Sequence, residues 1–188
     1  SIFALVCCDD PKTLPDQGLR RRINEKLEKS GTISKGECIG ILEMEETAKF
    51  VLELEQMTGR EIIWVRGESF DSLTKRYLPN RERRFCTSEL KVRPIYEYWF
   101  RHIGVPVIQR FGFRSDEPKR VFKFLDLAKE QGGFIKSKFP IGFHTSGRHK
   151  GKQRWEERAW YRPEFPMATD GITKYDVLKY WKTRSSIG

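Results

Sequence analysis

Cationic residues surround a cysteine near the middle of the chain. Cys86 lies between Arg84 on one side and Thr87, Lys91 and Arg93 on the other. Positive charges beside a thiol lower its pKa, and they also bind phosphate or sulfate oxygens, arginine through two parallel hydrogen bonds. The spacing therefore predicts an anion-binding pocket with Cys86 at its floor. The competing interpretation is a helix start with a buried structural cysteine and solvated arginines.

A second group of charges follows Gly112. Arg114 and Arg120 flank Asp116 and Glu117, where an apolar run passes into a helical pattern. Backbone donors at the start of a helix can bind a phosphate together with an arginine, so we expect nucleotide or anion contact here, with Arg114 as the main cation. The alternative is local pairing, in which both carboxylates support the helix through Arg120.

The segment 134–162 is basic and rich in aromatic residues. It holds eight Lys or Arg and two Glu, a net charge of +6, with His144 and His149 among them. Cations for phosphates interleaved with rings for bases are what single-stranded nucleic acid binding needs. The alternative is a solvated irregular loop with aromatics in the core, and the two histidines have no matching metal-ligand set. The residues expected to contact nucleic acid are Lys150, Lys152, Arg154, Trp155 and Arg158.

Two further features concern metals and thiols. Asp9 and Asp10 could hold Mg²⁺ beside substrate phosphates, or Asp10 followed by Pro11 is plain turn chemistry. The four cysteines show no C-x-x-C spacing, so no zinc or iron–sulfur site is indicated. We expect reduced thiols and a cytoplasmic location.

The length, net charge and apolar runs of the chain limit the class of protein. A chain of 188 residues is long enough for one domain with a full core, and we expect residues 1–188 to form a single domain. A net charge of +10 favours a polyanionic partner, although a merely soluble basic surface has the same charge. No apolar run approaches the length of a membrane span. The apolar residues 2–8 indicate a buried strand rather than a signal peptide.

Strand and helix patterns alternate along the chain. This order is typical of an α/β fold, a parallel twisted sheet with helices on both faces that binds ligands beyond the carboxyl ends of its strands. We expect a break or a fresh helix start at Pro94. The predicted strands are 2–8, 61–65 and 105–111, and the predicted helices are 19–27, 45–58, 69–77, 116–129 and one opening at Thr173.

Three segments resemble one protein family. Residues 84–94 are similar to its Cys-x-x-x-Leu-Lys-x-x-Pro segment, and 112–120 to Gly-Ile-Arg-x-x-Glu-Ser-x-Arg. Residues 165–181 resemble Pro-Leu-x-x-Trp-x-x-x-Asp-Val-x-x-Tyr, and 45–51 are a weaker match to a Glu-Thr-x-x-Phe-Val helix. The family is the phosphoadenosine-phosphosulfate-reductase-like family of the ATP-pyrophosphatase or adenine nucleotide α-hydrolase-like superfamily, in its phage and prokaryotic form.

The resemblance implies an adenine nucleotide ligand. ATP or an adenosine-phosphosulfate-type nucleotide is expected, with Mg²⁺ as its companion ion. The implied reaction is cleavage of an α–β phosphate bond or participation in sulfur transfer. The family's catalytic cysteine lies in a carboxyl-terminal Glu-Cys-Gly-Leu-His tail that this sequence lacks, so no catalytic residue is assigned. The implied nucleotide or anion contacts are Arg84, Cys86, Thr87, Lys91, Gly112, Arg114, Asp116, Glu117 and Arg120.

The chain departs from the family pattern at the phosphate loop. No Ser-Gly-Gly-x-Asp/Thr-Ser sequence follows the first strand, and residues 30–34 follow a helical pattern instead. Residues 2–8 therefore match the family's second strand, the loop is expected upstream, and 11–43 is an insertion. The alternative function is a non-catalytic nucleic-acid-binding or assembly component that has lost the loop. A second copy of the chain is a further candidate partner.

Overall fold

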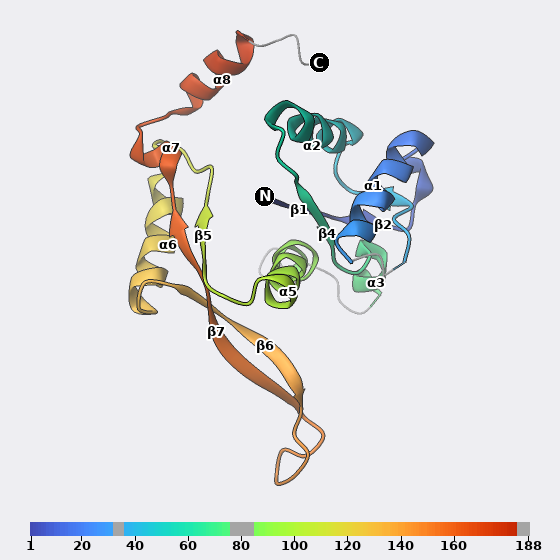
Figure 1. The fold of residues 1–188 in the computed structure, drawn as a ribbon, viewed down its shortest axis with the longest axis vertical. Helices are drawn as coiled ribbons and strands as arrows, with labels where there is room; N and C mark the ends of the chain where they lie inside the picture. Colours follow the sequence, from blue (N-terminus) through green and yellow to red (C-terminus); the bar gives the residue numbers. More distant parts are fainter. Residues whose placement is uncertain (32–35, 76–84, 184–188) are drawn as a thin grey trace. The chain divides into compact units, whose positions relative to one another are not determined.

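The computed structural model describes residues 1–31, 36–75 and 85–183, and Figure 1 traces its helices and strands. The chain divides into two compact units, Ser1–Gly104 and Val105–Gly188. The expectation of a single domain over residues 1–188 stays a prediction.

The strands of the first unit form two small sheets. β1 and β4 pair in parallel, with Phe3 opposite Trp64, and β2 and β3 pair antiparallel. Parallel pairing requires a crossover, which the intervening helices supply. The strands are β1 (Ile2–Leu5), β2 (Cys7–Cys8), β3 (Gly40–Ile41) and β4 (Ile63–Arg66).

The apolar run 2–8 changes partner at its midpoint. The Val6 N–H donates to Glu43 Oε2 at 3.1 Å, and the Val6 carbonyl accepts from Leu42 N at 3.0 Å. The prediction of one continuous parallel strand is therefore wrong. Hydrophobicity alone shows that both halves are buried, but it does not show which neighbour each half pairs with.

The predicted helices of the first unit are confirmed. Asp16 caps the first long helix by accepting from the Leu19 N–H at 2.9 Å, and Gly59 ends the second with φ at +59°. The short helix predicted over 69–77 is observed as α3 (Phe70–Thr74). The helices are η1 (Pro11–Thr13), α1 (Gln17–Lys29), α2 (Glu45–Thr58), α3 (Phe70–Thr74), α4 (Phe85–Thr87), η3 (Ser88–Val92) and α5 (Arg93–His102).

The predicted insertion 11–43 contributes much of the first unit's core. The α1 residues Leu19, Ile23 and Leu27 are buried in one cluster with Trp64, and Cys38 joins them from the segment before β3. These side chains follow the four-residue spacing of a helical face. Helix α1 and Cys38 are thus integral to the core of the unit, and the interpretation of 11–43 as an insertion stays a prediction.

A π-helical turn precedes Pro94. The π-helix η3 leads directly into α5, where the Arg93 N–H donates to the Ser88 carbonyl and Pro94 occupies the first turn. The expected fresh start at Pro94 is confirmed. Gly67 fits directly beside this turn, since a Cβ on it would lie 2.9 Å from the Glu89 carbonyl oxygen.

The second unit is built on a three-stranded mixed sheet with the order β5–β7–β6. β5 runs parallel to β7, and Val107 lies opposite Tyr161. The predicted strand 105–111 is confirmed as β5. The strands are β5 (Val107–Arg110), β6 (Ile135–Phe143) and β7 (Gln153–Glu164).

The basic segment 134–162 is a long β-hairpin, which Figure 1 shows in orange. β6 and β7 pair antiparallel with register shifts near Ile135 and Pro140. The expectation of an irregular segment is wrong here. Charged residues on both faces removed the alternation that marks a half-buried strand, whereas backbone pairing between the two strands does not depend on that alternation.

Three helices complete the second unit. Thr173 and Asp176 form the predicted capping box: the Asp176 N–H donates to Thr173 Oγ1, and Asp176 Oδ2 accepts from the Thr173 N–H at 2.9 Å. The predicted helix 116–129 is confirmed as α6, which begins two residues later than predicted, at Pro118. The helices are α6 (Pro118–Glu130), α7 (Pro166–Thr169) and α8 (Lys174–Lys182).

The structure has a mixed α/β architecture, as predicted. Its described strands form three small sheets, two of which contain a parallel pair. One continuous parallel sheet with helices on both faces stays a prediction. Over the same described ranges, every helix is too short or too polar to span a bilayer.

Ile23→Ala should destabilise the first unit by about 2–5 kcal/mol, because it opens a cavity in a fully buried site. Met57→Ala removes a half-exposed side chain from α2 and should change stability by only about 0.5 kcal/mol. Denaturant unfolding followed by circular dichroism measures both. Equal losses for the two variants would contradict the placement of α1 in the core.

Candidate functional site

The structure places Cys86 in a small apolar cluster of the first unit. Its half-buried side chain packs with Val6, Leu73 and Leu90. Thr87 beside it is exposed, and Arg84 lies outside the described residues. This packing favours the interpretation of Cys86 as a structural cysteine, and an anion pocket at its thiol stays a prediction.

The cations near Cys86 pair with carboxylates. Lys91 Nζ lies 3.0 Å from Glu43 Oε1, and Arg93 contacts Glu89 at 2.7 Å and Glu97 at 2.9 Å. The Arg93 pKa is raised, first by the Glu89 hydrogen bond and also by Glu97, although burial opposes it. An anion at this position would have to displace these carboxylates.

The Asp10 carboxylate and the backbone of Asp9 take part in local hydrogen bonds. Asp10 Oδ1 accepts from the Lys12 N–H at 3.0 Å and caps η1, and the Asp9 N–H donates to Asp71 Oδ2 at 2.7 Å. Turn chemistry is therefore what Asp10 performs. Among the described residues, no group of three or more acidic, cysteine or histidine side chains could hold a metal ion. Mg²⁺ beside the substrate phosphates stays a prediction, because one or two carboxylates together with phosphate oxygens are enough to hold it.

The segment after β5 joins the chain's third family-like segment. The Ser115 N–H and hydroxyl both donate to the Ile172 carbonyl, at 2.9 and 3.0 Å. The Lys174 N–H, at the start of α8, donates to Asp116 Oδ2 at 3.3 Å. The structure thus brings 112–120 and 165–181 together at the carboxyl end of the parallel pair β5–β7, the edge where open α/β sheets bind ligands.

Arg114 is the hub of an ion-pair network in this loop. Its guanidinium lies 2.9 Å from Asp116 Oδ1 and 3.4 Å from Glu117 Oε2, and Glu117 Oε1 contacts Arg120 at 2.7 Å. The side chain of Arg114 is 29% exposed, so it remains open to solvent. Exposed Gly112 begins the loop.

This network depresses the pKa of both carboxyls. Hydrogen bonds from the Arg120 side chain and then from the Arg114 N–H lower the pKa of Glu117. Burial raises the pKa of Asp116, but hydrogen bonds from the Arg114 side chain and the Lys174 N–H outweigh it, and the pKa is lowered overall. Both carboxylates are held in their charged form, ready to orient the arginines.

An aromatic cluster supports the loop from beneath. Phe111 and Phe113 stack with ring centroids 5.4 Å apart, and both lie 5.7 Å from the ring of Phe165. Phe124 of α6 completes the cluster, and the Arg120 guanidinium sits 4.0 Å from the Phe113 ring centroid. The sequence-based prediction did not include these rings among the site residues. The available signal was the presence of phenylalanines both before Arg114 and after Arg120.

A mostly apolar cavity of about 560 Å³ adjoins the end of β7. It is lined by Val121 and Leu125 of α6 together with residues 163–166 and 168–170. That volume falls within the range of about 300–1,000 Å³ typical of small-molecule sites. The cavity, the arginine network and the aromatic cluster all belong to the second unit.

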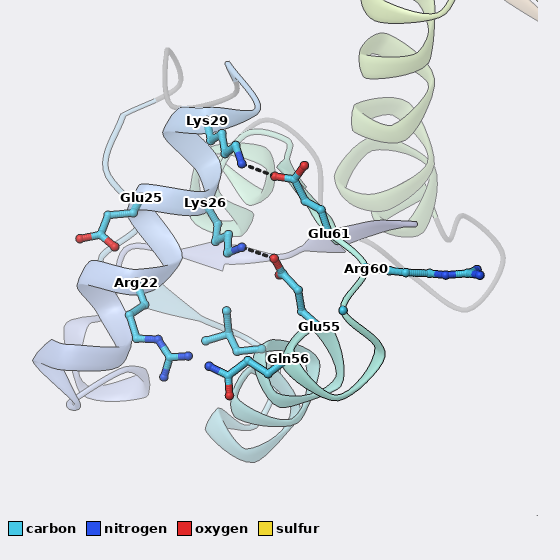
Figure 2. A pocket seen from close by; sticks show the side chains of 10 residues that line it. Arg22, Glu25, Lys26, Lys29, Glu55, Gln56, Arg60 and Glu61 are labelled. Carbon is cyan, nitrogen blue, oxygen red and sulfur yellow. Dashed lines mark hydrogen bonds and ion pairs between the residues drawn. The ribbon is translucent and has the colours of Figure 1, made fainter.

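A charged cavity of about 460 Å³ lies in the first unit between α1 and the turn from α2 into β4 (Figure 2). Two ion pairs cross it, from Lys26 to Glu55 and from Lys29 to Glu61, both at 2.5 Å. The Glu61 hydrogen bond raises the pKa of Lys29. Because this cavity borders the amino end of β4, away from the ligand-binding edge, we assign it a structural role.

The two predicted anion sites belong to different units. Cys86, Thr87 and Lys91 lie in the first unit, and Arg114 and Arg120 lie in the second. Their convergence on one phosphate stays a prediction.

The predicted nucleic-acid residues lie on the β6–β7 hairpin. Lys150, Lys152 and Arg154 are exposed at and near its tip, where the His144 and His149 rings are 5.8 Å apart. Trp155 is 54% exposed. Arg158 differs from the others, because Glu156 accepts two hydrogen bonds from it, both at 2.9 Å.

The chain is similar in sequence to a known protein over much of its length. The chain is 30% identical over 138 residues to an uncharacterized protein of Methanocaldococcus jannaschii, an alignment covering 70% of this chain. The chain spans only 28% of that protein's length. No protein-family model and no solved structure matches the chain.

Glu117→Gln should lower the melting temperature near neutral pH, since it removes a charge that both arginines use. The pKa of Glu117 is depressed in the folded chain, so its contribution is present above the unfolded pKa of about 4.3 and is lost as the pH falls through the folded value. The two melting curves should therefore converge in acid. Glu130→Gln, at the other end of α6, is the control; the same pH dependence there would argue against the network.

Proposed function

We propose that the chain is a nucleotide-binding domain of the phosphoadenosine-phosphosulfate-reductase-like type. The observation that carries this proposal is the junction of its second and third family-like segments at the carboxyl end of β5–β7, through Ser115, Ile172 and the Asp116–Lys174 contact. Segments 57 residues apart in sequence meet at the edge that such folds use for ligands. ATP or an adenylyl-sulfate nucleotide is the proposed ligand.

Arg114 is the proposed phosphate ligand. It follows the end of a parallel strand, is partly open to solvent and already forms ion pairs with two carboxylates. A phosphate presents oxygens in a geometry close to that of a carboxylate, so it can replace one of them. Arg120 is the second cation, held over the Phe113 ring. Gly112, Asp116 and Glu117 position the two arginines.

The adjoining cavity is the proposed site of the adenine ring. Its walls from α6 and from the end of β7 are mainly apolar, which suits a flat base more than a phosphate. The base and the phosphates would then occupy neighbouring parts of one unit. Cleavage of an α–β phosphate bond or sulfur transfer is the proposed reaction, and no catalytic residue is assigned.

The family's continuous parallel sheet, with helices on both faces, is part of this proposal. Its support is that β1–β4 and β5–β7 are each parallel pairs linked through helices. The proposal includes a cytoplasmic location, where nucleotides are abundant and thiols stay reduced. The relative in Methanocaldococcus jannaschii adds no activity to it.

Arg114→Ala should weaken binding of ATP, adenosine phosphosulfate or its 3′-phosphorylated form about tenfold or more, because charged hydrogen bonds contribute roughly 1.5–3 kcal/mol. Isothermal titration of each nucleotide into the protein measures this. Arg110→Ala is the matched control, since Arg110 pairs with Glu164 on the same sheet. No heat with any of the three nucleotides, or equal losses in both variants, would refute the proposal.

A second candidate function is binding of single-stranded nucleic acid by the β6–β7 hairpin. The observation that favours it is a pair of exposed aromatics on one face of the hairpin. Phe143 of β6 lies opposite Gln153 of β7, and Gln153 is on the same face of β7 as Trp155. The Phe143 side chain is 65% exposed and that of Trp155 is 54% exposed. Exposed rings beside Lys152 and Arg154 provide stacking and charge together.

Trp155→Ala should weaken oligonucleotide binding about fivefold or more, because stacking contributes roughly 1–3 kcal/mol per base. Lys152→Gln should reduce the slope of log affinity against log salt by about 0.7. Fluorescence anisotropy at several salt concentrations measures both effects, with exposed Tyr175→Ala as the control. Affinity that does not change with salt would exclude this function.

A further inference from the structure

Two buried cysteines from distant parts of the chain meet in the first unit. Cys7 lies in β2 and Cys38 lies two residues before β3, 31 positions later. The Cys7 thiol donates a hydrogen bond to Cys38 Sγ over 2.6 Å. The two side chains are only 1% and 0% exposed. Neither belongs to the proposed nucleotide site or to the hairpin.

The backbone around this pair is fixed on both sides. Asn24 of α1 clamps Cys38 by accepting from its N–H at 2.8 Å and donating to its carbonyl at 3.0 Å. The β2–β3 pairing, which sets Cys7 opposite Ile41, fixes the other partner. The short distance between the sulfurs is therefore built into the fold and does not depend on free rotation of two exposed side chains.

The surroundings of the pair shift the pKa values of the two thiols in opposite directions. The hydrogen bond from Cys7 lowers the pKa of Cys38, burial opposes this, and the nearby Arg66 guanidinium lowers it further. The same hydrogen bond, together with burial, raises the pKa of Cys7. Arg66 is itself 3% exposed and is held by the carbonyls of Gly36 and Gly67. Arg20 also favours a Cys38 thiolate, and Glu43 opposes it.

We propose that Cys7 and Cys38 form a dithiol site that hydrogen peroxide oxidises to a disulfide. The Cys38 thiolate attacks one peroxide oxygen, the O–O bond breaks, and hydroxide leaves to give a sulfenic acid on Cys38. Cys7 sulfur then attacks Cys38 sulfur; the S–O bond breaks, the S–S bond forms, and water leaves with the Cys7 proton. In sum, two thiols and one peroxide give one disulfide and two waters.

The other two cysteines have different surroundings. Cys8 Sγ lies 3.2 Å from Thr13 Oγ1, and Cys86 packs in the separate cluster with Val6 and Leu90. Adjacent residues of a strand point to opposite faces, so Cys8 cannot replace Cys7 in the pair. A Cys7–Cys38 disulfide would close a loop that contains all of α1, which constrains the unfolded chain and stabilises the first unit.

The experiment treats the folded protein with hydrogen peroxide, alkylates it after denaturation, and maps its tryptic peptides by tandem mass spectrometry, whose fragments separate Cys7 from Cys8 within their shared peptide. Before oxidation all four cysteines should be alkylated. Afterwards two should be protected, with the peptide of Cys7 cross-linked to that of Cys38, and the link should disappear on reduction. Protein oxidised after unfolding in guanidinium chloride should give mixed pairings, because the fold no longer selects the partner.

Cys86→Ser and Cys8→Ser are the matched controls, and both should keep the Cys7–Cys38 link. The link is measured in the protein with all four cysteines present. The result therefore does not depend on how a substitution of Cys7 or Cys38 would affect folding. A cross-link through Cys8 or Cys86, four cysteines still alkylated, or Cys38 advancing to sulfinic acid while Cys7 stays free would each overturn the proposal.

Discussion

The hydrogen bonds from Ser115 to the Ile172 carbonyl are the constraint on which the proposed site depends. They tie the loop after β5 to the turn between α7 and α8. They add to the packing of Phe111 and Phe113 on Phe165, and Asp116 reinforces the junction by accepting from the Lys174 N–H. A backbone carbonyl that accepts two donors from one serine fixes both position and orientation, which is what a loop needs in order to present an arginine in one direction.

The arginines at this loop are prearranged by carboxylates rather than left to solvent. Glu117 contacts both Arg114 and Arg120, and the ring of Phe113 restricts Arg120 from another side. Such a network lowers the entropic penalty of ordering long side chains when a ligand binds, but the ligand must compete with the carboxylates. In the proposed site, a doubly charged phosphate would compete with these carboxylates better than a singly charged anion would.

The first unit is organised around buried contacts instead. The apolar face of α1 and Cys38 share one buried cluster with Trp64, and Asn24 holds the backbone of Cys38 through two hydrogen bonds. Lys91 and Arg93, predicted as anion ligands, stabilise this unit by pairing with carboxylates of the same unit. Lys91 and Arg93 thus pair with carboxylates, and an anion pocket at the Cys86 thiol stays a prediction.

Local patterns determined the helices of this protein. The α1 and α2 residues follow helical spacing, Gly59 ends α2, and the Thr173–Asp176 box starts α8, because each of these signals acts over one or two turns. The residue types around Arg114 also indicated a charged loop between a strand and a helix. Only the tertiary structure decided the partners: that residues 2–8 change sheets at Val6, that 134–162 pairs as a hairpin, and that Cys7 meets Cys38. Strand pairing and side-chain contact depend on which distant segments arrive at the same place, and hydrophobic or charged character in one segment carries no information about the identity of its partner.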